Sequence, residues 1–131
     1  MTVNSFRDLL VWQKGMDLTT ATYRVAKVLP KLEQNVLGYQ LRKTSISIPS
    51  NIAEGASGGS NATYIHHLRI ARASGCELET QLEIGARTEF FTATQIEPLL
   101  RQAQEIEKML NGLIRALKKA AKRNAGSSAQ N

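Results

Sequence analysis

Apolar residues recur along most of the chain at alternating steps of three and four, the spacing that places them on one face of an α-helix. This pattern predicts four amphipathic helices, over about residues 8–28, 36–56, 60–89 and 94–123. No segment shows the alternation of apolar and polar residues that is typical of a half-buried strand. Four such helices joined by short loops predict an all-α fold, an antiparallel up-down-up-down four-helix bundle.

Two helix starts carry sequence signals. Ser60 is a favourable N-cap for the third helix. The segment from Thr94 to Glu97 has the spacing of a capping box, in which two side chains and two backbone amides pair reciprocally. The chain is long enough for one domain, which we predict over residues 1–123. The polar residues 124–131 then form a flexible tail.

Pro49 falls near the middle of the second predicted helix. A proline inside a helix leaves the carbonyl four residues earlier, here that of Ser45, without its amide partner. We therefore expect a helix kink at Pro49. Short polar side chains nearby can bond to the freed backbone groups: Ser45, Ser47, Ser50 and Asn51.

The net charge of +6 comes from 17 Lys and Arg against 11 Asp and Glu, and most of it is local. Five cations fall within nine residues that hold no acid: Arg115, Lys118, Lys119, Lys122 and Arg123. Without them 12 cations and 11 acids remain, so the rest of the chain carries only +1. These five are the candidate nucleic-acid-binding residues, and the absence of aromatic residues among them favours phosphate contact over base stacking. The alternative is a solvated helix end, where the helix dipole favours cations.

Composition and cysteine content indicate the cellular compartment. The chain is 42% hydrophobic and 21% charged, like an ordinary globular protein, and has no apolar run of the roughly 18 residues that a membrane span needs. The first residues lack the basic start and apolar run of a secretory signal. The single cysteine, Cys76, cannot form an internal disulfide. We therefore expect a cytoplasmic protein with no membrane partner.

The histidines do not have the spacing of a metal site. The di-metal sites of helical bundles use a Glu three residues before each His, but those positions hold Thr63 and Tyr64. His66 and His67 also point about 100° apart on a helix, too far to share one ion easily.

The acids and the thiol are expected to be structural. Three glutamates of the third helix should pair with arginines on neighbouring turns, or with a partner helix, rather than bind metal: Glu77, Glu79 and Glu83, with Arg69, Arg72 and Arg87. Cys76 has no histidine within one turn and is expected to be a small buried, inert thiol. We therefore predict a non-enzymatic protein with no catalytic residue, metal or cofactor; a small metal-dependent hydrolase is the remote alternative.

Four phrases of the sequence resemble, in order, a bacterial family of four-helix-bundle proteins first noticed as reading frames in the intervening sequences of large-subunit ribosomal RNA genes. They are FRDLLVWQK from residue 6, QLR from residue 40, SIPSNIAEG from residue 47 and ELETQL from residue 77. The resemblance covers about residues 6–117. It implies a four-helix bundle that assembles into a homopentameric ring, in a family whose members mostly have no assigned activity. A related accessory protein of diversity-generating retroelements is a basic pentameric barrel that binds nucleic acid and a reverse transcriptase.

Five polar residues on otherwise packed helices carry this resemblance: Arg42, Asn51, Glu54, Glu77 and Glu79. We interpret them as a hydrogen-bonded network that fixes helix register or subunit contacts, with a ligand site as the alternative. The small residues Ala71, Gly75 and Gly85 leave room for a further helix to approach the third one. Together with the resemblance, they predict a cyclic homo-oligomer of five chains.

The sequence therefore predicts a homo-oligomeric adaptor that binds RNA, DNA or a nucleic-acid enzyme through the basic end of its last helix. A ring of five would gather about +25 of charge at one rim, and such a field attracts polyanions. The alternative is a protein-binding scaffold that does not bind nucleic acid.

Overall fold

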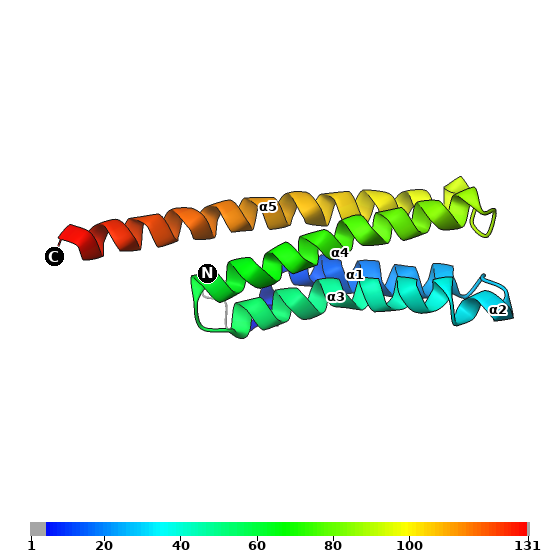
Figure 1. Cartoon of the computed structure of the whole chain (residues 1–131), viewed down its shortest axis with the longest axis horizontal. Coiled ribbons are helices and arrows are strands. Elements are labelled where there is room, and N and C mark those ends of the chain that lie inside the picture. Colours follow the sequence, from blue (N-terminus) through cyan, green and yellow to red (C-terminus); the bar gives the residue numbers. More distant parts are fainter. Residues whose placement is uncertain (1–4, 131) are drawn as a thin grey trace.

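Four long helices form an antiparallel bundle (Figure 1). The computed structural model of the chain describes residues 5–130, with the side chains of residues 5–126. Its elements are a 3-10 turn over Phe6–Asp8, α1 over Leu10–Ala26, a short α2 over Lys31–Gln34, α3 over Leu37–Ser57, α4 over Asn61–Arg87 and α5 over Ala93–Gln130. The long helices run alternately up and down, each packs against the next, and α5 returns to α1. The described part of the chain is all-helical, as predicted.

The core lies along the centre of the bundle and draws on all four long helices. Its largest fully buried side chains are Leu18, Leu41, Ile48, Ile52, Leu68, Leu78, Leu82, Ile106 and Leu110. Full burial of one such side chain contributes roughly 1.5–3 kcal/mol, so this stripe of leucine and isoleucine is the main source of stability. Within residues 5–130, no helix is both long and apolar enough to cross a membrane.

The two ends of α4 are closed by local hydrogen bonds. Ser60 is its N-cap, as predicted, because the Ser60 side chain accepts a hydrogen bond from the amide of Thr63 at 3.1 Å. At the other end, the amide of Phe90 donates to the carbonyl of Gly85 at 2.9 Å, and Glu89 between them adopts a left-handed φ of 68°. This arrangement is a Schellman motif, which turns the chain sharply from α4 towards α5.

The start of α5 corrects the predicted capping box over residues 94–97. The box is formed two residues earlier, where the amide of Thr92 donates to Oε1 of Gln95 at 2.8 Å and the amide of Gln95 donates to Oγ1 of Thr92 at 3.2 Å. Phe91 and Ile96 flank this box at the positions of a hydrophobic staple, and both are buried. The sequence spacing allows a capping box at residues 92–95 and at 94–97 equally. Burial of Phe91 and Ile96 favours the first of them.

The far end of α5 also differs from the sequence prediction. The helical backbone continues to Gln130, through the residues 124–130 that we expected to leave the helix. A helix that already exists can add residues at one hydrogen bond each without a new nucleus, which favours extension into a weak sequence. In Figure 1 this part of α5 extends past the end of the other three long helices. The connection predicted between the first two long helices also differs, because it contains the short helix α2.

The carbonyl that Pro49 leaves unpaired in α3 contributes to the contact between α3 and α1. Helix α3 continues through Pro49, and the carbonyl of Ser45 that the proline frees lies 2.9 Å from the hydroxyl donor of Thr19 on α1. The same hydroxyl is shared with the carbonyl of Gly15 on α1, also at 2.9 Å. Pro49 itself is buried beside Gly15, where an added Cβ would lie 3.4 Å from the Pro49 Cβ. The freed carbonyl therefore bonds to the neighbouring helix instead of the polar residues close to it in sequence. The kink at Pro49 stays a prediction.

Replacing Thr19 by Val should destabilise the protein by about 1–3 kcal/mol, because it leaves the buried Ser45 carbonyl without a donor. In a Pro49→Ala background the amide of residue 49 can donate to that carbonyl instead, so the cost of Thr19→Val should fall by at least half. A double-mutant cycle followed by urea unfolding measures both costs. Equal costs in the two backgrounds would show that Thr19 does not serve the carbonyl freed by Pro49.

Candidate nucleic-acid interface

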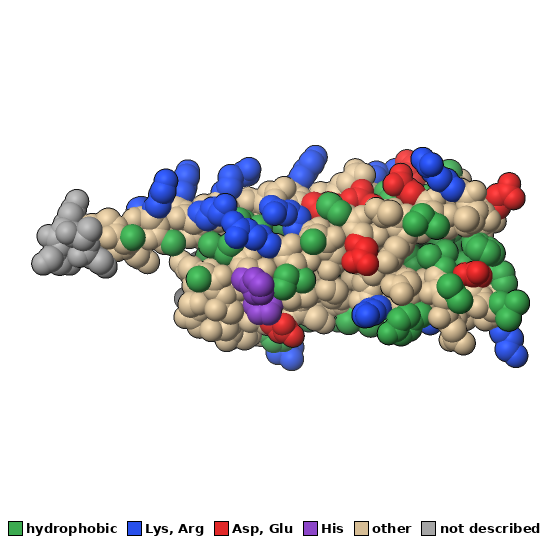
Figure 2. Space-filling view, viewed as in Figure 1, with side chains coloured by type: hydrophobic (Ala, Val, Ile, Leu, Met, Phe, Trp, Pro, Cys, Tyr) green, Lys and Arg blue, Asp and Glu red, His purple; other side chains and the backbone are tan. Residues whose placement is uncertain are grey.

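The five basic residues predicted from the sequence all lie on α5, and all are exposed. They follow each other at i, i+3, i+4, i+7 and i+8, which places them on one face of the helix. None of the five forms an ion pair with any residue that the structure describes. Figure 2 shows Lys and Arg side chains gathered along the C-terminal half of α5.

Apolar residues on the other side of α5 orient this stripe. Ile114 is buried in the core cluster and Leu117 packs against it, so the cations on the opposite side of the helix point to solvent. Further along, Lys118 and Lys122 border a shallow apolar hollow with Ile65 of α4. The packing of α5 on α4 thus fixes which way the basic stripe faces.

Two arginines of α4 extend the basic surface across the α4/α5 contact. Arg69 and Arg72 line one hollow together with Asn111 of α5, one turn before Arg115. Nη1 of Arg72 donates to Oδ1 of Asn111 at 2.7 Å. We expected these arginines to pair with glutamates of their own helix, and the structure places them against α5 instead. The basic face is defined here by seven residues: Arg69, Arg72, Arg115, Lys118, Lys119, Lys122 and Arg123.

The five polar residues predicted to form one network are only partly brought together. Arg42 lies apart, where its guanidinium donates to the carbonyl of Gln34 at 2.8 Å and to Oε1 of Gln34 at 3.3 Å, which fastens α2 to α3. Glu79 faces α5 and accepts a hydrogen bond from Nε2 of Gln104 at 3.0 Å. Asn51 and Glu54 of α3 lie against His67 of α4, whereas Glu77 is exposed and bonds to Gln81 on its own helix.

The contact between α3 and α4 carries a row of polar pairs spaced one heptad apart on α4. The pairs are Gln81 with Thr44 at 3.0 Å, Ser74 with Ser47 at 2.8 Å and His67 with Asn51 at 3.0 Å. Glu54 lies 3.4 Å from the same nitrogen of His67, and Glu77 accepts a hydrogen bond from Gln81 at 3.3 Å. A slip of α4 by one residue would break every pair, so the row favours one register of α4 against α3. The role predicted for the five polar residues stays a prediction.

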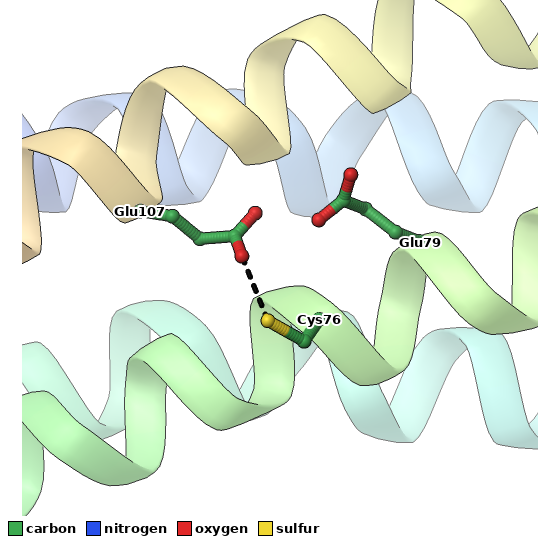
Figure 3. A group of neighbouring side chains, drawn as sticks. All are labelled: Cys76, Glu79 and Glu107. Carbon is green, nitrogen blue, oxygen red and sulfur yellow. Dashed lines mark hydrogen bonds between the residues drawn. The ribbon is translucent and has the colours of Figure 1, made fainter.

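A second cluster lies at the α4/α5 contact (Figure 3). Two of its members, Cys76 and Glu107, line the same hollow as Arg69 and Arg72. Cys76 and Glu79 lie one turn apart on α4, and Glu107 reaches towards both from α5. The thiol of Cys76 donates to Oε1 of Glu107 at 2.8 Å. Cys76 is exposed, so the prediction of a buried thiol is wrong.

The expected pairing of the α4 glutamates with arginines is wrong, whereas the alternative of a partner on another helix holds for Glu79, which bonds to Gln104 of α5. None of Glu77, Glu79 and Glu83 forms an ion pair with an arginine among the described residues. Sequence reasoning missed Glu107, which lies on the core side of α5 between the buried Ala103 and Leu110. The signal available in the sequence was the position of Glu107 within the apolar stripe of the last helix.

Partial burial and neighbouring acidic groups shift the pKa values in this cluster. Partial burial, together with the nearby Glu79, raises the pKa of Glu107 from its ordinary 4.5 to about 7. The hydrogen bond to Glu107, with partial burial, raises the pKa of the Cys76 thiol to about 11. At neutral pH the thiol therefore keeps its proton and is a weak nucleophile.

The raised pKa of Glu107 predicts a pH-dependent stability. Between pH 4.5 and about 7 the folded state holds this proton more tightly than the unfolded state, so stability falls as the pH rises through that window and levels off above it. With allowance for solvent screening, the loss should be on the order of 1 kcal/mol. Glu107→Gln should remove it, whereas Glu83→Gln, at an exposed carboxylate of α4, should not. Urea unfolding at several pH values measures this, and identical pH profiles for the two variants would contradict it.

Comparison with known proteins assigns the chain to a family. The model of the 23S rRNA-intervening sequence protein family matches residues 7–112, and the chain belongs to this family. It is similar to a crystal structure of a protein of unknown function from the S23 ribosomal protein family of Bacteroides thetaiotaomicron. The two are 30% identical, with a TM-score of 0.75 over 80% of this chain and 98% of the other. The comparison with curated proteins gives no match.

Proposed function

We propose that this member of the 23S rRNA-intervening sequence protein family is a non-enzymatic, homo-oligomeric adaptor that binds RNA or DNA through its basic face. One observation carries the proposal: the five cations of α5 are exposed on one side of the helix and form no ion pair with a described residue. Cations in this state are available to phosphates, whereas cations already paired with acids are not.

The shape of the basic face favours contact with the phosphate backbone. From Arg115 to Arg123 the stripe is about 12 Å long, at roughly 1.5 Å per residue. Duplex DNA carries one charge per roughly 1.7 Å of its axis, so several cations of a straight helix can contact phosphates at once. Residues 115–123 include no aromatic side chain on which a base could stack. Duplexes are therefore the expected ligands, with little sequence preference.

Self-association would strengthen such binding. The contact between α1 and α3 carries an apolar hollow lined by Trp12, Met16, Ile46 and Pro49, among others. Met16 and Ile46 remain 43% and 42% exposed, which is unusual for large apolar side chains that line one hollow. In the cyclic order α1, α3, α4, α5 this surface lies opposite the basic face. Chains that associate through it would leave every basic face open, and their fields would add.

Light scattering tests the oligomer. We expect a mass that is a multiple of the 14.4 kDa chain, five-fold for the ring implied by the family resemblance. Ile46→Glu places a charge in the apolar hollow and should reduce the mass while the helical circular dichroism is retained. A wild-type mass near 14.4 kDa at micromolar concentration would overturn the proposed self-association.

Nucleic-acid binding is tested directly by fluorescence anisotropy. Labelled RNA and DNA duplexes of unrelated sequence are titrated with the wild-type protein at low salt. We expect micromolar affinity for each, with less than about tenfold difference between sequences, because phosphates carry no sequence information. If neither duplex binds at low salt, the proposal fails and a protein-binding scaffold that uses the α1/α3 hollow becomes the better explanation.

A further inference from the structure

We infer that Cys76, Glu79 and Glu107 form a binding site for a divalent cation of the zinc type, which links α4 to α5. The three side chains come from two helices and offer one sulfur and two carboxylate oxygens, with ligand atoms that all lie within 4.8 Å of one another. Figure 3 shows the three groups directed towards a common space between the helices. Cys76 and Glu107 share a hollow with Arg69 and Arg72 of the basic face, but metal binding can be tested without nucleic acid.

The distances are close to those of a bound ion. Zinc bonds of about 2.0–2.3 Å place the ligand atoms of one tetrahedral ion roughly 3.3–3.8 Å apart. An ion would therefore need side-chain rotations of about 1 Å, which spread the 2.8 Å pair of Cys76 Sγ and Glu107 Oε1 and draw together any pair near the 4.8 Å limit. The exposed Cys76 is free to make such a movement. The three protein ligands leave a fourth position for water.

An unpaired carboxylate oxygen points to a missing partner. Oε1 of Glu107 accepts the hydrogen bond from Cys76, but Oε2 is buried and has no hydrogen-bond partner among the described residues. A buried oxygen of a carboxyl group without a partner is unfavourable, and a bound ion is one of its ordinary explanations. A cation between the helices would supply the partner for this oxygen.

The surroundings hold the ligands in position. Gln104 donates to Oε1 of Glu79 at 3.0 Å, and a hydrogen bond of this kind orients a metal-binding carboxylate. Gly75 leaves space for Glu107, because an added Cβ there would lie 3.2 Å from its Cγ. Arg72 lines the same hollow as Cys76 and Glu107. The site is thus built from both helices rather than from one exposed side chain.

The donor set selects the type of ion. Thiolates bind zinc and similar borderline-soft metals, whereas magnesium and calcium take oxygen ligands. On binding, the S–H bond of Cys76 breaks, a metal–sulfur bond forms and the proton leaves to solvent. Glu107 gives up any proton it holds in the same step. Binding should therefore tighten as the pH rises, because the metal competes with protons for these groups.

Cobalt titration of the full-length wild-type chain tests the site. Co²⁺ bound by a thiolate has a near-ultraviolet charge-transfer absorption, and Cys76 is the only cysteine, so this signal reports on Cys76 alone. We expect the absorption to saturate at one Co²⁺ per chain and to disappear when Zn²⁺ is added. Zn²⁺ should also raise the melting temperature of the wild type.

Three variants give the matched comparison. Cys76→Ser should abolish the absorption, and Glu107→Gln should weaken cobalt binding at least tenfold. Glu83→Gln removes an exposed carboxylate one turn from Glu79 and should leave binding unchanged. Circular dichroism confirms that each variant is folded. The inference is overturned if the wild type shows no thiolate absorption at neutral pH, if one ion is bound per two chains, or if Glu107→Gln and Glu83→Gln bind cobalt alike.

Discussion

Replacing Lys118, Lys119, Lys122 and Arg123 together by Gln is expected to weaken duplex binding by about 10²–10³-fold near 0.1 M salt. Each phosphate contact adds about 0.9 to the salt slope, so at this salt concentration each contact accounts for nearly tenfold in affinity. Two or three contacts among the four residues give the stated loss. Gln keeps the helix propensity and leaves the apolar side of α5 unchanged, so the fold should be retained.

A second quadruple variant separates position from total charge. Four exposed cations at the α2 end of the bundle, away from the α5 overhang, are replaced by Gln: Arg24, Lys27, Lys31 and Lys43. This variant loses the same charge, but we expect less than about threefold change in affinity, because contacts at the phosphates are retained. Equal losses in the two variants would mean that only net charge matters. If the α5 variant binds as tightly as the wild type, the basic stripe is only a solvated helix end.

Gly85→Ala is expected to destabilise the protein by about 1–3 kcal/mol. Gly85 is buried near the C-terminal end of α4, where the chain turns back in the Schellman motif. An added Cβ would overlap the ring of Phe91, at 2.6 Å from Cε2, and Phe91 is itself buried in the core. The ring can move only by disturbing the start of α5. Urea unfolding measures the loss.

The same substitution at Gly112 is the control. Gly112 lies inside α5, and an added Cβ would have nothing within 4 Å. Here Ala should stabilise the helix by about 0.5–1 kcal/mol, because glycine loses more conformational freedom on folding. The two substitutions are therefore expected to change stability in opposite directions. A stabilising Gly85→Ala would show that the α4–α5 turn is not packed against Phe91 as described.

The sequence pattern predicted the helices well because the core depends on local spacing. A stripe such as Leu78 and Leu82 repeats every turn, and the stripe fixes which face of a helix is buried. The helix ends were less predictable. Capping at Thr92 rather than Thr94 depends on the burial of Phe91, and burial is decided by parts of the chain that are distant in sequence.

The candidate sites also differ in how far the sequence could predict them. The stripe from Arg115 to Arg123 could be predicted because its members are neighbours on one helix. The partners of Arg72 and Cys76 could not, because Asn111 and Glu107 lie 39 and 31 residues further along the chain. Contacts between α4 and α5 decide these pairs, and the spacing of residues within one helix contains no information about them.

The salt dependence of duplex DNA binding tests the proposed role of the basic face most directly. Affinities of the wild type and of the α5 quadruple variant are measured over a series of salt concentrations, and log affinity is plotted against log salt. The wild type should give a steep negative slope, at about −0.9 per phosphate contact. The slope of the variant should be shallower by about 2–3 units, because Lys118, Lys119, Lys122 and Arg123 supply two or three of the contacts. Parallel lines for the two proteins would contradict binding through the basic face of α5.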